Sequence, residues 1–185
     1  MRGIDVSRAL AAIAIAFAAA VAGLAGCDSR LTSGSATDDR SSSAADMAFT
    51  HDIEDDLSGY YRPVSAVAVG RYRLTHLFLG QVKDFNAWEG GAKGGAYGPV
   101  MFEFTDAAGA TVRVLPKAYA VGNGRLRFAG SHQDLGEVSF EGALDRGALA
   151  TAKRNLGDEA PVLSGTLRVG GHSFGQQKVR WYGGD

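Results

Sequence analysis

Short runs of alternating apolar and polar residues, separated by glycines, fill the chain from Leu57 to its C-terminus. This stretch contains 22 of the 26 glycines of the protein. A period of two places successive side chains on opposite faces of a strand, and turn residues at short intervals are typical of antiparallel sheets. The pattern therefore predicts a mostly β fold.

The clearest turn in this stretch is Asn123-Gly124, because both residues accept the positive φ angles of a type I′ hairpin. A two-residue loop at this point pairs Tyr119 with Phe128 and Val121 with Leu126. The apolar side chains then share one face of the hairpin. Arg125 and Arg127 lie on the other face, where we expect them to be solvated.

A second hairpin is predicted around the turn 106–110. Its register places Glu103 opposite Arg113, as a cross-strand ion pair. Near the C-terminus, Val179 and Trp181 are out of phase with the preceding alternation. A β-bulge at 175–177 would restore the phase, since one extra residue re-aims the side chains that follow it.

One segment has helical rather than alternating spacing. Over 148–156 the residues Leu149 and Leu156 fall on one side, Asp145 is a candidate N-cap and Gly157 a candidate C-terminal cap. With about eight strand-like runs, we predict an antiparallel β-barrel or sandwich of about eight strands with one short helix, in a single domain over 57–185. Closure of the sheet would remove its exposed edges.

The N-terminus has a different character. Arg2 and Arg8 precede an apolar run over 9–22, and the run is followed by Leu24-Ala25-Gly26-Cys27, which includes the single cysteine of the chain. This segment resembles the lipobox of bacterial lipoproteins. The resemblance implies a lipoprotein signal peptide over 1–26 and lipidation of Cys27, so that a lipid anchor would hold the protein at the membrane.

The same resemblance implies a location in the cell envelope, with the domain facing the periplasm. Asp28 resembles the retention signal for the inner membrane. The alternative is ordinary secretion with cleavage at Ala20-Val21-Ala22, which would leave Cys27 as a free thiol. Because there is no second cysteine, the exported domain cannot form an internal disulfide.

Residues 27–56 are rich in Ser and Asp, and we predict a lipidated N-terminus followed by a disordered acidic tether. Residues 28–56 contain two arginines and eight acidic residues (net −6). Residues 57–185 contain fifteen basic and eleven acidic residues (net +4). This basic excess could attract anionic headgroups or acidic polymers, or the tether could fold back on it. Nucleic acid is not an expected partner outside the cytoplasm.

The segment 80–98 interrupts the strand pattern with aromatic and charged residues. We expect one helical turn over 84–89, in a loop that caps the end of the barrel and contacts a ligand or partner. The alternative is that two of its aromatic rings, Phe85 and Trp88, belong to the core. The candidate binding residues of this region are Asp84, Phe85, Trp88, Glu89 and Tyr97, together with His76 from the preceding strand.

The sequence contains no recognisable catalytic or metal-binding motif. Its four histidines are scattered without the spacing of a metal site, and no phosphate-binding loop, nucleotide fingerprint or nucleophile elbow occurs. We therefore predict no catalytic residue, no metal and no cofactor.

Taken together, these patterns predict a lipid-anchored extracytoplasmic β-domain that binds a protein partner or a small apolar ligand, as an envelope assembly or accessory factor. Two alternatives stay open. One is a cell-envelope hydrolase that uses carboxylates near the central loop, and the other is a structural or inhibitory module that acts through strand edges or loops.

Overall fold

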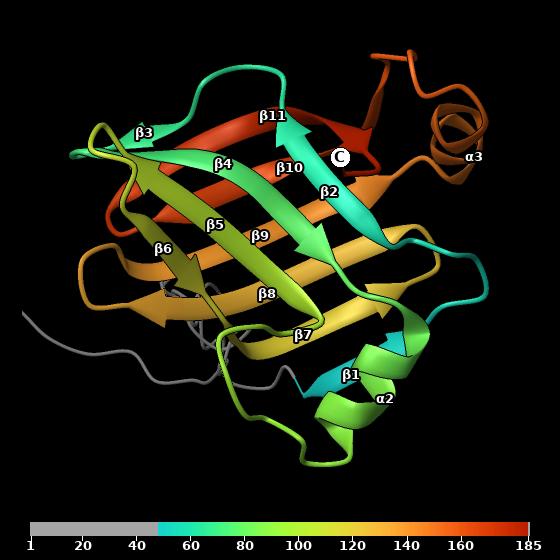
Figure 1. The fold of residues 1–185 in the computed structure, drawn as a ribbon, viewed down its shortest axis with the longest axis horizontal. Helices are drawn as coiled ribbons and strands as arrows, with labels where there is room; N and C mark the ends of the chain where they lie inside the picture. Colours follow the sequence, from blue (N-terminus) through green and yellow to red (C-terminus); the bar gives the residue numbers. More distant parts are fainter. Residues whose placement is uncertain (1–47, 185) are drawn as a thin grey trace, which may run out of the picture. The chain divides into compact units, whose positions relative to one another are not determined.

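The computed structural model describes residues 48–184, which form one long sheet and two helices (Figure 1). The elements are β1 (Phe49–Asp52), β2 (Gly59–Pro63), β3 (Ala68–Val69), β4 (Tyr72–Leu79), α2 (Val82–Glu89), β5 (Val100–Asp106), β6 (Thr111–Val114), β7 (Pro116–Gly122), β8 (Arg125–His132), β9 (Gly136–Leu144), α3 (Arg146–Arg154), β10 (Pro161–Val169) and β11 (His172–Tyr182). The predicted mostly β fold is confirmed.

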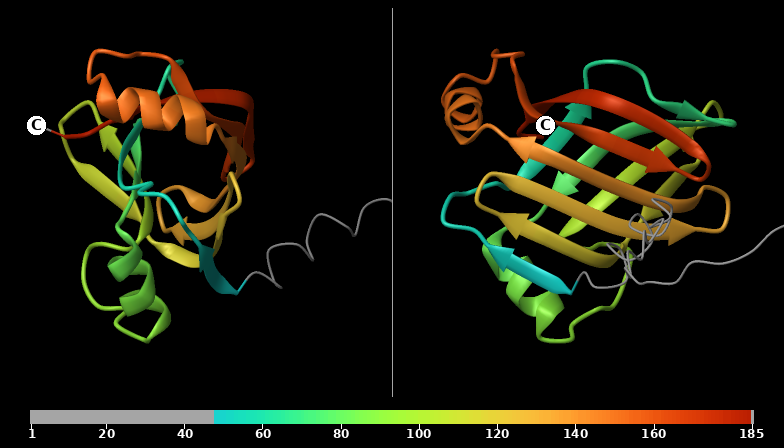
Figure 2. Two further views of the ribbon diagram at one scale, coloured as in Figure 1. Left: turned by 90° about the vertical axis from the view of Figure 1, so that its right-hand side faces the viewer. Right: turned by 180° about the vertical axis from the view of Figure 1, so that it is seen from behind.

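The strands follow one another in the order β1-β7-β8-β9-β10-β11-β2-β4-β5-β6, and the short β3 pairs with β4 outside this path. All pairs are antiparallel except β1 with β7, which is parallel. The sheet curls so that β4, β5 and β6 lie across from β7, β8 and β9 (Figures 1 and 2). It forms an open half-barrel.

The expected closed barrel or sandwich of about eight strands is therefore wrong, and so is the expectation of a single helix. The end strands of the path, β1 and β6, are not paired with each other within residues 48–184. To close the barrel, β6 would have to pair with the edge of β7 that faces away from β8. β1 already occupies that edge, because it pairs with β7 from Phe49 to Asp52.

Aromatic side chains fill the space between the two halves of the curled sheet. The ring of Phe102 on β5 lies 4.9 Å from that of Phe128 on β8 and 5.9 Å from that of Phe140 on β9, measured between centroids. All three side chains are buried, as is Tyr61 on β2. Burial of this apolar area, at about 25 cal/mol per Å², is the main stabilising contribution to the half-barrel.

Both predicted hairpins are confirmed. Tyr119 pairs with Phe128 and Val121 with Leu126 around Asn123-Gly124. In the other hairpin, Glu103 lies opposite Arg113, and Arg113 Nε donates to Glu103 Oε2 at 2.9 Å.

The predicted bulge near the C-terminus is also present. The register between β10 and β11 shifts between Gly165 and Leu167, and Gln176 has a positive φ of 50°.

The predicted C-terminal helix is α3, with Asp145 as its N-cap. Asp145 Oδ1 accepts a hydrogen bond from the Ala148 backbone N–H at 2.9 Å, and Leu149 is buried. The predicted end of the helix is wrong. The backbone leaves the helical conformation at Asn155, so Gly157 does not cap it and Leu156 is 80% exposed.

The folded part of the chain begins earlier than the sequence predicted. We expected residues up to Asp56 to belong to the disordered tether, but Phe49–Asp52 form β1. A parallel pairing joins segments that are far apart in the sequence, and it leaves no local turn pattern to recognise. Cys27, the signal peptide and the first part of the tether lie outside the described residues.

We predict that Gly165→Ala destabilises the half-barrel by about 2–4 kcal/mol, because the core has no room for another methyl group. A Cβ at Gly165 would lie 2.7 Å from Phe140 Cζ and closer still to the Glu141 carbonyl oxygen. Gly175→Ala is the control, since its Cβ would meet no atom within 4 Å. Urea unfolding measures both variants, and equal midpoints would contradict the prediction.

Candidate functional site

The first predicted site residue, Asp84, lies in the first turn of α2. Its Oδ2 accepts a hydrogen bond from the Gln81 backbone N–H at 2.8 Å. A carboxylate at this position satisfies an orphan amide and interacts favourably with the positive end of the helix dipole. Asp84 therefore helps to fix the start of a helix of two turns, longer than the single turn that we expected.

Phe85 and Trp88 both lie in the core, as the alternative interpretation of the sequence had it. The Phe85 ring lies 5.4 Å from Tyr119 on β7, and the Trp88 ring lies 6.3 Å from Phe49 on β1. These edge-to-face contacts attach α2 to the β1–β7 end of the sheet.

Glu89 connects the same three elements through polar contacts. Its Oε1 accepts a hydrogen bond from the Tyr119 hydroxyl at 3.0 Å and lies 2.8 Å from His51 Nδ1 on β1. Burial and the neighbouring Glu89 carboxylate raise the pKa of Tyr119 above its usual range, so the hydroxyl keeps its proton and remains a donor. Glu89 thus has structural partners, and His51 is a member of this cluster that the sequence did not indicate.

His76 faces outward, although its alternation with Leu74 suggested the core face. The register between β4 and β5 shifts between Leu74 and His76, and the irregularity turns the rest of β4 over. His76 Nδ1 lies 3.9 Å from Glu103 Oε1, and its ring lies 4.8 Å from that of Tyr60. Burial lowers the pKa of His76 below its usual value, and the Glu103 carboxylate opposes this only in part.

Tyr97 is the most exposed of the predicted residues, with 61% of its surface accessible. The Arg113 guanidinium lies 4.6 Å from the centre of its ring, and Arg113 also donates to Glu103. A cation at this distance holds the ring on the outer side of β5 and β6.

The structure brings three predicted residues, Asp84, Trp88 and Tyr97, to one hollow of about 320 Å³ beside Phe78. A second hollow of about 550 Å³ shares lining residues with it, and a third of about 480 Å³ shares lining residues with the second. Phe78 lines the first and second hollows, and Tyr60 lines the second and third. We call these three hollows together the outer groove. Its aromatic lining residues are Tyr60, Phe78, Trp88, Tyr97, Trp181 and Tyr182.

The rings at the centre of the outer groove come from neighbouring strands. Tyr60 on β2 pairs with Phe78 on β4, and their ring centroids lie 5.4 Å apart. At one end the Arg62 guanidinium lies 3.7 Å from the centre of the Tyr182 ring. The sequence did not indicate Tyr60 or Tyr182, because β2 and β11 become neighbours only in the folded sheet.

One polar atom of this region has no partner. Within residues 48–184, Trp88 Nε1 is buried and makes no hydrogen bond. An unsatisfied donor of this kind costs about 1–3 kcal/mol, and native proteins contain few of them.

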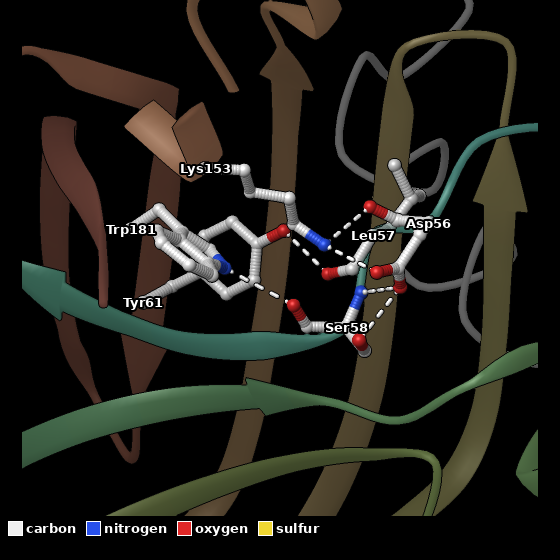
Figure 3. A network of polar contacts seen from close by, with 6 residues as sticks. All are labelled: Asp56, Leu57, Ser58, Tyr61, Lys153 and Trp181. Carbon is white, nitrogen blue, oxygen red and sulfur yellow. Dashed lines mark hydrogen bonds and ion pairs between the residues drawn. The ribbon is translucent and has the colours of Figure 1, made fainter. Parts of the chain in front are cut away.

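A network of polar contacts surrounds residues 56–58 (Figure 3), and Asp56, Ser58, Lys153 and Trp181 of this network also line the outer groove. Lys153 Nζ on α3 donates to the Asp56 carbonyl oxygen at 2.6 Å and to its Oδ2 at 2.8 Å. Tyr61 Oη donates to the Leu57 carbonyl at 2.6 Å, and Trp181 Nε1 to the Ser58 carbonyl at 3.0 Å. We call these contacts the junction clamp.

Two more ion pairs extend this attachment, since Arg146 on α3 contacts both Glu54 and Asp55. The last acidic residues of the expected tether therefore fold back onto basic side chains of the domain. This arrangement corresponds to one of the alternatives left open by the charge distribution.

No group of three His, Cys, Asp or Glu side chains within residues 48–184 could hold a metal ion. Neither helix in this range is long and apolar enough to cross a membrane.

Comparisons with protein-family models, with curated proteins and with solved structures gave no match to this chain.

We predict that Trp88→Ala lowers the free energy of unfolding by about 3–5 kcal/mol, because it removes a large side chain that is only 6% exposed. Tyr97→Ala, from the exposed end of the same hollow, should change it by less than about 0.5 kcal/mol. Chemical denaturation compares the two variants. Similar losses for both would show that Tyr97 is structural as well.

The junction clamp predicts a pH dependence at acidic pH. Partial burial raises the pKa of Asp56, but hydrogen bonds from Lys153 and Ser58 lower it more, and the pKa falls from 3.8 to about 2. As the pH falls, the Asp56 carboxylate is therefore protonated at a higher pH in the unfolded chain than in the folded protein. The stability that Asp56 contributes is complete above about pH 4 and is lost as the pH falls towards 2.

Asp56→Asn should remove this part of the acid dependence of unfolding, measured with urea between pH 5 and pH 2. The effect is small, because the Asp56 side chain is 68% exposed and solvent screens the pair. Lys153→Met should flatten the pH dependence of unfolding over the same interval. Combining it with Asp56→Asn should flatten that dependence no further. A wild-type pH profile in both variants would contradict the assignment.

Proposed function

We propose that residues 48–184 form a recognition domain without catalytic activity, and that it binds a segment of a partner protein in the outer groove. The observation that carries this proposal is the group of aromatic side chains that line neighbouring hollows on the outside of a half-barrel whose interior is filled. The hydrolase alternative has less support, because Asp84 and Glu89 each have structural partners.

The filled interior argues against an internal site for a small apolar ligand. The cavity beneath residues 52–55 has a volume of about 20 Å³. Such a volume is about that of one water molecule, whereas ligand pockets are usually about 300–1,000 Å³. Recognition therefore uses the outer surface.

The residue types of the outer groove favour a polypeptide as the bound molecule. Tyr, Trp and Arg are the residues most enriched at the centres of protein interfaces, because they combine a large apolar area with a polar group. In the outer groove, Arg62 stacks on Tyr182 at one end and Arg113 stacks on Tyr97 at the other. Lys83, Asp84 and Lys153 add charges of both signs along the wall.

The position of the domain in the cell is part of the same proposal. Lipidation at Cys27 would tether it to a membrane of the cell envelope, facing the periplasm, where it would act as an assembly or accessory factor. The residues that carry this part of the proposal are those of the lipobox-like segment.

Site-specific photocrosslinking in intact cells tests the binding surface. A photoreactive phenylalanine analogue replaces Tyr60, Phe78 or Tyr97 in turn, and Ala108, in the exposed turn between β5 and β6, serves as the control position. We expect one protein adduct of the same mass from all three groove positions and none from Ala108. Adducts that are absent, or identical at Ala108, would contradict the proposal.

A second variant separates specific binding from chance encounter. Tyr60→Ala should abolish the adduct formed at Phe78, whereas Arg73→Ala on the neighbouring outer surface should leave it unchanged. An adduct of only a few hundred daltons would show that the groove holds a small ligand, and the proposed partner class would then be wrong.

A further inference from the structure

A further hollow lies away from the outer groove, on the outer surface of β8, β9, β10 and β11. Its volume is about 560 Å³. The side chains that give it its chemistry are Arg125, Arg127, Glu141, Ser164, Thr166 and Lys178. None of them lines the outer groove. We call this depression the basic hollow.

The register of the sheet explains why this surface is hollow. Ala143 on β9 pairs with Arg125 on β8 and with Ser164 on β10, and Ser164 pairs in turn with Lys178 on β11. The long basic side chains of Arg125 and Lys178 therefore lie at the two sides of the hollow, with the small side chains of Ala143 and Ser164 between them. At about 4.8 Å per strand, the backbones of Arg125 and Lys178 lie roughly 14 Å apart.

The cations of the basic hollow are available to a ligand. The side chains of Arg125, Arg127 and Lys178 make no ion pair or hydrogen bond within residues 48–184. By contrast, Arg113, Arg146 and Arg180 on the same domain are each paired with a carboxylate. Three free cations against one carboxylate, Glu141, make the hollow electropositive, and such a surface attracts anions.

We propose that the basic hollow binds an acidic saccharide, a sugar chain that carries carboxylate groups. The arginine and lysine side chains match the carboxylates of such a chain. Its hydroxyl groups need partners that both donate and accept, which Ser164 and Thr166 provide, and Glu141 accepts from hydroxyl donors. This site is independent of the proposed partner groove.

Other anionic ligands match the lining less well. Binding of single-stranded nucleic acid relies on aromatic side chains for base stacking, and none of the described lining residues is aromatic. Peripheral membrane binding gains strength from apolar side chains that insert among the headgroups, but the large exposed ones in residues 48–184, Val64, Val82, Tyr97 and Leu156, all lie outside the hollow. An acidic saccharide uses the groups that are present.

Calorimetric titration of the full-length protein with oligogalacturonate tests this site. A neutral maltooligosaccharide of equal length is the control ligand. We expect saturable binding of the acidic chain at low salt, weaker binding as salt is added, and no binding of the neutral chain. The double variant Arg125→Gln/Arg127→Gln should weaken binding by about tenfold or more.

Two further variants distinguish a built site from diffuse charge. Arg73→Gln/Arg154→Gln removes the same net charge from exposed positions elsewhere that have no carboxylate partner within residues 48–184, and it should leave affinity within about twofold. Ala143→Leu fills the floor without a change of charge and should also weaken binding by about tenfold. Urea unfolding confirms that each variant is folded.

The outcomes that overturn the proposal are distinct. Equal weakening by both double variants would show diffuse electrostatic attraction. Binding to vesicles containing anionic phospholipid, without binding to oligogalacturonate, would show a membrane contact. The absence of any saturable binding at low salt would show that the hollow has no saccharide site. None of these results bears on the crosslinks from the outer groove.

Discussion

The contact of Phe102 with Phe128 and Phe140 is the interaction on which the rest of the structure depends. It joins β5 to β8 and β9, strands from opposite sides of the curled sheet, without any hydrogen bond between the two ends of that sheet. Since side-chain packing rather than closure holds the halves together, the interior must be filled by large rings. A filled interior leaves recognition to the outer surface, and the outer groove and the basic hollow both lie there.

The parts of the fold that the sequence predicted are those that depend on neighbours along the chain. Asn123-Gly124 determines its hairpin, Asp145 caps its helix, and the bulge around Gln176 follows from the phase of the apolar residues. The missed features depend on distant partners. The parallel strand β1 pairs with β7 about seventy positions later, and the irregularity before His76 exists only in the register of β4 with β5. Neither leaves a local pattern to recognise.

The candidate site was predicted in part for the same reason. The unusual composition of 80–98 identified Asp84, Trp88 and Tyr97, which line one hollow, but also Phe85 and Glu89, which serve to attach α2. Composition does not distinguish a ring that binds a ligand from one that completes a core. Tyr60, Trp181 and Tyr182 come from β2 and β11, whose side-by-side position is a property of the folded sheet alone.

The junction clamp has a mechanical consequence. If Cys27 is anchored, a pull on the domain enters the described chain ahead of Phe49 and reaches the four-residue ladder of β1 first. Beyond it stand the ion pairs of Arg146, and then the contacts of Lys153, Tyr61 and Trp181 with residues 56–58. Under load, β1 can therefore detach first and lengthen the tether. The junction clamp then keeps the force from reaching β2 and the outer groove that β2 helps to form.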